Sequence, residues 1–221
     1  MFFMNSRMIL FDLDGTLVDS RADLTTAVNL VRADYGLPAL PLATMTRFVG
    51  DGVHKLLERA LQDAAAGWSM DVAVQRMARH YHDHLLDETC LYPGVAETLP
   101  LLARDWRLGV VTNKPQAAAC AVCEKLGIAA VLAVVVGGGR CAQLKPRPEP
   151  LLMALELAGA GVEGSWMVGD HRTDLGAASA AGLRACFCAY GFGQQDDQRA
   201  DAVIQHFAQL PMVLREADRR D

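Results

Sequence analysis

The chain has 221 residues, of which 52% are hydrophobic and 21% charged, a composition typical of globular proteins rather than of disordered chains. Its formal net charge of -5 argues against nucleic-acid binding, which would require a basic face. Apolar stretches fall short of the ~20 residues that a membrane-spanning helix needs, and residues 1–7 are too short for a signal peptide, so we expect a cytoplasmic protein without membrane contact.

The first predicted element is a buried strand at residues 8–11, where four large apolar residues stand in a row. Asp12 and Asp14 follow at once, with a turn at Gly15. In a parallel α/β sheet the carboxyl ends of the strands border the ligand crevice, so both acids would stand at its mouth. Two close carboxylates favour a cation such as Mg²⁺ between them. A calcium loop is excluded because Thr16 replaces a required acid or amide, whereas a solvated Asp-Gly turn stays open here.

Helical patterns then follow one another without a strand between them. Ser20 and Ser69 are expected to cap the first and third of these helices. Three or four helices in succession are more than a crossover between two parallel strands needs. We therefore expect an inserted α-helical cap domain at residues 20–87 and a core domain formed by residues 1–19 and 88–221.

In the second half of the chain, apolar strands alternate with helices. The expected strands are 108–112, 131–136, 166–170, 184–189 and 202–204. The expected helices are 115–126, 148–158, 175–181 and a last one from about residue 206. This alternation predicts an α/β core with a doubly wound, Rossmann-like parallel sheet.

Polar side chains stand at the ends of four predicted strands. In chain order they are Asp12 and Asp14, Thr112 and Asn113, Lys145, and Asp170 with Asp174. Because the carboxyl ends of parallel strands share one edge, these groups are expected to meet in one crevice. An acid that attacks phosphorus, an ammonium group that offsets phosphoryl charge and a second acid that moves protons together suit phosphoryl transfer.

Four motifs carry these residues and read D-L-D-G-T-L-V-D-S, V-T-N-K-P, K-P-R-P-E-P and G-D-H-R-T-D. They resemble the four motifs of the haloacid dehalogenase superfamily. The resemblance implies a nucleophile at Asp12, an acid/base at Asp14, phosphate binding by Thr112 and Lys145, and a supporting acid at Asp174. It also implies a Mg²⁺ cofactor held by Asp12, by the backbone carbonyl of Asp14 and by Asp170.

Further letters, among them F-V-G-D-G-V and A-Y-G-F-G, resemble the phosphoglycolate phosphatase branch of this superfamily. The implied activity is a Mg²⁺-dependent phosphatase that passes through an aspartyl phosphate and acts on a small phosphorylated metabolite, first of all 2-phosphoglycolate. Another small ester such as a sugar phosphate, or a phosphomutase of the same fold, remains the alternative. A hydrolytic dehalogenase would lack Asp14. Two letters depart from the branch: His171 replaces a serine, and Arg140 stands where an acid is common.

The substrate side of the site is less defined by the sequence. Arg21, Arg47 and Lys55 are candidates for binding a second anion on the substrate, with solvated helix charge as the alternative. Gly50 could let the backbone approach the substrate or only permit a turn, and Asn113 is a further candidate for substrate binding.

His171 adjoins the predicted metal ligand Asp170. Lys114 is expected near the rim of the crevice, with a solvated charge at a helix start as the alternative. We expect a monomer or a homodimer.

Overall fold

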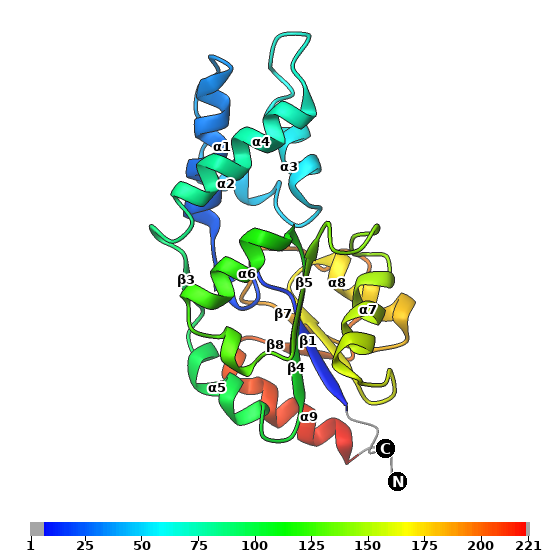
Figure 1. The fold of residues 1–221 in the computed structure, drawn as a ribbon. Helices are drawn as coiled ribbons and strands as arrows, with labels where there is room; N and C mark the ends of the chain where they lie inside the picture. Colours follow the sequence, from blue (N-terminus) through cyan, green and yellow to red (C-terminus); the bar gives the residue numbers. More distant parts are fainter. Residues whose placement is uncertain (1–6, 220–221) are drawn as a thin grey trace.

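The computed structural model describes residues 7–219 (Figure 1). The segment expected to be too short for a signal peptide therefore falls, except for Arg7, outside the described residues. Six parallel strands form one sheet in the order β5-β4-β1-β6-β7-β8. The strands are β1 (Met8–Phe11), β4 (Arg107–Pro115), β5 (Val134–Gly138), β6 (Trp166–Gly169), β7 (Arg184–Cys188) and β8 (Ala202–Ile204). The predicted α/β fold with a parallel sheet is confirmed.

The central strand β1 is buried on both faces, as its unbroken apolar run predicts. Ile9 and Phe11 pack on one side of the sheet, while Met8 and Leu10 pack on the other, because side chains alternate along a strand. The first side is covered by α5 (Val95–Leu102), α6 (Gln116–Lys125) and α9 (Leu210–Asp218). The second is covered by α7 (Glu149–Ala158) and α8 (Arg172–Ala181).

A group of helices stands beyond the edge of the sheet at which β1 and β4 end (Figure 1). We call α1–α4 the helical insertion: α1 (Arg21–Asp34), α2 (Leu42–Thr46), α3 (Val53–Ala60) and α4 (Met70–Asp83). Within it α1 packs on α2, α3 and α4, and α3 packs on α4. The chain enters and leaves through a two-stranded antiparallel ribbon of β2 (Val18–Asp19) and β3 (Cys90–Leu91).

The strand predicted at 131–136 begins later than its apolar pattern suggests. A short 3-10 turn occupies Ala129–Val131, and β5 runs over Val134–Gly138. Val134 lies opposite Gly109 of β4, so the pairing register sets where the strand begins. The apolar residues before Val134 belong to the connection between α6 and β5. An apolar run by itself does not show where such a connection ends and the strand begins.

Two predicted helix caps also differ. The helices begin where Ser20 and Ser69 predict, but neither hydroxyl caps its helix. Ser20 donates to Asp14 at 2.5 Å instead, because a nearby, partly buried carboxylate is the stronger acceptor. Helix α8 begins three residues earlier than predicted, with His171 as its N-cap.

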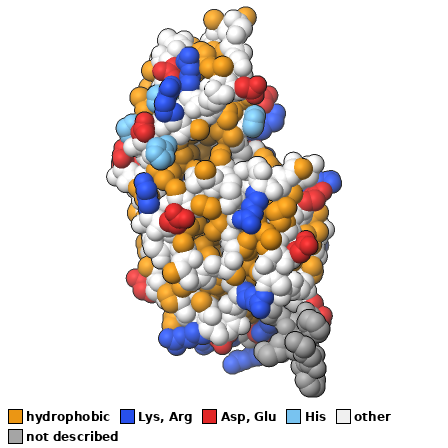
Figure 2. Space-filling model, in the orientation of Figure 1, with side chains coloured by type: hydrophobic (Ala, Val, Ile, Leu, Met, Phe, Trp, Pro, Cys, Tyr) orange, Lys and Arg blue, Asp and Glu red, His pale blue; other side chains and the backbone are white. Residues whose placement is uncertain are grey.

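Among residues 7–219, none of the helices has the length and apolarity to cross a membrane. Figure 2 shows positive and negative side chains interspersed on the face that it presents. A mixed surface of this kind agrees with the low net charge of the chain and presents no extended basic face there.

Candidate active site

Three buried acids meet one lysine at the carboxyl ends of β1 and β6. Oxygens of Asp12, Asp170 and Asp174 lie within 4.8 Å of one another. The Nζ atom of Lys145 lies 2.9 Å from Asp12 Oδ1 and 2.7 Å from Asp174 Oδ1, and it donates to the carbonyl of Val111 at 2.6 Å. The structure thus brings these four predicted site residues together, from positions up to 162 residues apart in the sequence.

The cluster holds more negative charge than Lys145 offsets. Burial raises the pKa of Asp12 to about 6, with Asp174 adding to the effect and Lys145 opposing it. Burial, with Asp174 and Asp12 beside it, also raises the pKa of Asp170 well above its ordinary value. Burial alone would lower the pKa of Lys145, but Asp12 and Asp174 raise it. A cation would relieve this excess charge.

The residues present fit Mg²⁺. Asp12 Oδ1 is buried and, among residues 7–219, its contact is the ion pair with Lys145, which leaves it available as a metal ligand. Asp170 receives the hydroxyl of Thr16 at 3.2 Å and the backbone N–H groups of Phe192 and Gly193 at 3.0 and 2.7 Å. Carboxylate oxygens are the donors that Mg²⁺ prefers. Asp12 and Asp170, with Asp174 adjacent, are therefore the residues that would hold it.

Gly15 keeps the first loop against this cluster. Its φ of 89° is in the region that favours glycine, and a Cβ atom there would lie 2.1 Å from Asp170 Oδ2. A larger residue would displace Asp170 from the N–H groups that bind it. The Asp-Gly turn seen in the sequence is thus a packing requirement of the acidic cluster.

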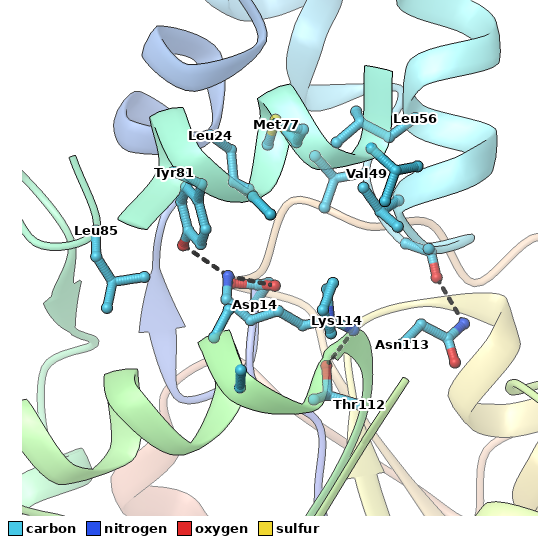
Figure 3. Close-up of a pocket in the computed structure, with 18 of the residues that line it drawn as sticks. Asp14, Leu24, Val49, Leu56, Met77, Tyr81, Leu85, Thr112, Asn113 and Lys114 are labelled. Carbon is cyan, nitrogen blue, oxygen red and sulfur yellow. Dashed lines mark hydrogen bonds and ion pairs between the residues drawn. The ribbon is translucent and has the colours of Figure 1, made fainter. Parts of the chain in front are cut away.

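Asp14 lies outside the acidic cluster, at the wall of a cavity, and is held by Lys114 (Figure 3). Lys114 Nζ donates to the two Asp14 oxygens at 2.7 and 3.0 Å and to the hydroxyl of Tyr81 on α4 at 2.7 Å. Lys114 lines the cavity, and the alternative of a solvated charge at a helix start is wrong, because the side chain is only 2% exposed. Burial lowers its pKa, but Asp14 and Tyr81 raise it to a value above the ordinary one.

Thr112 and Asn113 lie at the end of β4, and both line the same cavity. The Thr112 hydroxyl accepts from the backbone of Lys114 at 3.3 Å. The Asn113 amide donates to the carbonyls of Gly50 and Lys145 at 3.0 and 2.9 Å, and its oxygen accepts from the N–H of Lys145 at 2.9 Å. Asn113 therefore ties the loop before α3 to the loop that carries Lys145.

His171 and Gly50 are neighbours across the junction between the helical insertion and the sheet. His171 Nδ1 accepts from the N–H of Thr173, and Asp174 accepts from the N–H of His171 at 2.9 Å, which forms a capping box on α8. The histidine thus performs the capping that a serine would perform at this position. Burial lowers its pKa. Gly50 has a φ of 121°, and a Cβ there would lie 2.9 Å from the His171 ring.

The other candidate cations do not line the cavity. Arg21 forms a two-pronged ion pair with Asp19 and lies over the ring of Phe192. Lys55 pairs with Glu58 at the surface, and Arg47 is exposed. Arg140 is exposed as well and donates to the carbonyl of Val135. Lys114 is the one lysine or arginine among the described residues that line the cavity.

The cavity lies between the helical insertion and the end of β4, with a volume of about 250 Å³. Asp14, Lys114, Thr112 and Asp170 form its polar side. Most of its wall is apolar and includes Leu24, Val49, Leu56, Met77 and Leu85 (Figure 3). A space of this size suits a small ligand, since sites for drug-sized molecules begin at roughly 300 Å³.

The family model described as haloacid dehalogenase-like hydrolase matches residues 9–188. The chain belongs to the haloacid dehalogenase-like hydrolases. The predicted family is therefore confirmed, and the match contains all the motif residues of the site.

Relatives within the family carry a phosphatase name. The chain is 40% identical over 212 residues to a phosphoglycolate phosphatase of Cupriavidus necator, covering 93% of this chain and 92% of the relative. It is also 40% identical over 214 residues to one of Rhodospirillum rubrum, covering 92% and 89%. The crystal structure of a predicted phosphoglycolate phosphatase from Haemophilus somnus superposes with a TM-score of 0.87 at 28% identity, covering 96% of this chain and 99% of the other. These relatives confirm the predicted enzyme class, a phosphatase.

Sequence reasoning missed the contact among Asp14, Lys114 and Tyr81. One signal was present, because only four lysines occur in the chain and one of them stands two residues after a predicted strand. No signal marked Tyr81, which lies in an ordinary helical pattern 33 residues before Lys114.

Proposed function

We propose that this chain is a Mg²⁺-dependent phosphomonoesterase that hydrolyses 2-phosphoglycolate to glycolate and phosphate through an aspartyl phosphate. The observation that carries the proposal is the meeting of Asp12, Asp170, Asp174 and Lys145 in one buried cluster, with Asp14 beside a small cavity. The names of relatives at 40% identity support the choice of substrate.

In the proposed mechanism Asp12 attacks the phosphorus atom, and the bond between phosphorus and the ester oxygen breaks. Asp14 enters this step in its protonated form and gives its proton to the leaving oxygen. A water molecule then attacks the phosphorus of the aspartyl phosphate, Asp14 takes the proton from that water, and phosphate leaves as Asp12 is regenerated. Lys145 offsets the charge of the phosphoryl oxygens, and the Thr112 hydroxyl donates a hydrogen bond to one of them. When bound, Mg²⁺ supplies further neutralisation of that charge.

We also propose that residues 20–87 form a cap domain that covers the cavity. Support comes from the position of α1–α4 beyond the sheet edge and from the two-stranded ribbon through which the chain enters and leaves. Val49, Leu56 and Met77 of this part of the chain line the cavity opposite Thr112. Such a cover would exclude water from the phosphoryl group during transfer.

A substrate screen tests the proposed function. Phosphate release is measured with 2-phosphoglycolate, sugar phosphates, nucleotides and pyrophosphate, with Mg²⁺ and with a chelator in excess. We expect the largest kcat/KM for 2-phosphoglycolate and loss of activity with the chelator. Mg²⁺ is also expected to raise the unfolding temperature of the wild type, because it binds the folded state alone. A flat profile would remove the substrate assignment, and isomerisation of a sugar 1-phosphate would favour a phosphomutase.

A further inference from the structure

A buried lysine joins Asp14 to the helical insertion. Lys114 lies near the end of β4, and its ammonium group contacts both oxygens of Asp14 and the hydroxyl of Tyr81 (Figure 3). The two oxygens belong to one carboxylate, so the ammonium group has two partners, Asp14 and the Tyr81 hydroxyl. Lys114 is therefore placed to hold Asp14 against α4.

Tyr81, the partner of Lys114 on the helical insertion, is buried as Lys114 is. Tyr81 is 5% exposed, and its ring centroid lies 4.5 Å from Lys114 Nζ, within the range of a cation–π contact. Ser20, directly before α1, donates to Asp14 Oδ1 at 2.5 Å. The orientation of the Asp14 carboxylate thus depends on groups that lie in the insertion or at its start.

We propose that Lys114 and Tyr81 are positioning residues that orient Asp14 for proton transfer while α4 is seated on the sheet. The proposal rests on the proposed function, in which Asp14 protonates the leaving oxygen. Displacement of α4 would remove the Tyr81 hydroxyl and free the long Lys114 side chain to leave Asp14. Proton transfer is thereby linked to closure of the site, and the link matters most for esters whose leaving oxygen is strongly basic.

The leaving group separates this role from general structural damage. Phenyl phosphate and 4-nitrophenyl phosphate have similar shapes and suit a mostly apolar cavity, but only the phenolate of the first needs protonation as it leaves. The value of kcat/KM covers the steps up to the first irreversible one, here transfer of the phosphoryl group to Asp12. A residue that positions Asp14 should therefore affect the two esters unequally.

The experiment compares Lys114→Met and Tyr81→Phe with Asp14→Asn and the wild type. General acid catalysis contributes about 10²–10⁴-fold, so Lys114→Met is expected to lose about 10²-fold in kcat/KM with phenyl phosphate and under about 10-fold with 4-nitrophenyl phosphate. Tyr81→Phe keeps the buried ring and is expected to lose roughly 3–10-fold, again mainly with phenyl phosphate. Tyr35→Phe is the control, because the buried Tyr35 hydroxyl has no hydrogen-bond partner among residues 7–219.

Equal losses with both esters would overturn the positioning role. A rise in KM confined to 2-phosphoglycolate, with kcat unchanged, would also overturn it and would make Lys114 a binder of the substrate carboxylate. If the folded wild type hydrolyses no phosphate ester, the proposed function fails and this proposal fails with it. Tyr81→Phe carries the test on its own where Lys114→Met does not fold.

Discussion

Lys145 and Lys114 are both buried and both contact carboxylates, yet their surroundings differ. Lys145 contacts Asp12, Asp174 and the carbonyl of Val111, all of which belong to the sheet, to the loops at its edge or to α8. Lys114 contacts Asp14 beside the sheet and Tyr81 on α4 of the helical insertion. One lysine is enclosed by the core alone, and the other spans the junction.

This difference suggests that binding of phosphate and metal and transfer of protons depend on different parts of the structure. The acidic cluster around Lys145 is formed wherever the parallel sheet is formed, because each member stands at or beside a strand end. The contacts of Asp14 are complete only when α4 is in place. Binding of phosphate and metal is therefore expected to depend on the core, and proton transfer on the insertion as well.

The largest expected effect comes from a substitution in the acidic cluster around Lys145. Asp12→Asn should lower phosphate release by roughly 10⁴-fold or more, because an amide is a poor nucleophile and removal of a nucleophile costs rates of this order. The protein should still fold, since the substitution is nearly isosteric and removes a charge that burial disfavours. Release of phosphate and far-ultraviolet circular dichroism measure the two outcomes.

Asp105→Asn is the matched control, because Asp105 is exposed and lies outside the site. It should keep full activity. Appreciable turnover by Asp12→Asn would contradict the assignment of the nucleophile. The acidic cluster around Lys145 would then not be the place where the phosphoryl group is transferred.

The free energies of unfolding of Lys145→Met and Lys114→Met compare the contributions of the two buried lysines to stability. Lys145→Met leaves Asp12 and the fully buried Asp174 without their cation and is expected to lower the free energy of unfolding by about 3–5 kcal/mol. Lys114→Met should cost less, about 1–2 kcal/mol, because Asp14 is at the cavity wall and keeps the hydrogen bond from Ser20. Urea unfolding without Mg²⁺ measures both. A larger loss for Lys114→Met would reverse the comparison.

A smaller effect is expected where the insertion touches α8. Gly50→Ala would place a methyl group against the His171 ring and disturb the hydrogen bond from Asn113 to the Gly50 carbonyl. We expect kcat/KM to fall about 3–10-fold, in line with the loss of about one hydrogen bond. Gly36→Ala is the control, because Gly36 also has positive φ but has nothing within 4 Å of its would-be Cβ. Similar activities for the two variants would show that this contact does not matter.

Particular residues show how far the sequence could be read. The acids after β1 and β6 were predictable because a short apolar run followed by Asp and Gly indicates a strand end and a turn. The contacts of Ser20 and Lys114 with Asp14 were not predictable. A serine before a helix is ordinarily a cap and a lysine at a helix start is ordinarily solvated, whereas here both bind Asp14.

The sequence by itself determined the α/β fold, the helical insertion and the set of acids, threonine and lysine at the strand ends, because hydrophobic period and turn residues are local properties of the chain. Only the tertiary structure decided which groups contact which. Lys114 and Tyr81 meet across 33 residues, and Lys145 and Asp12 across 133, through packing that no local pattern encodes. The choice of partner for a buried charge depends on which opposite charge the completed fold brings within reach.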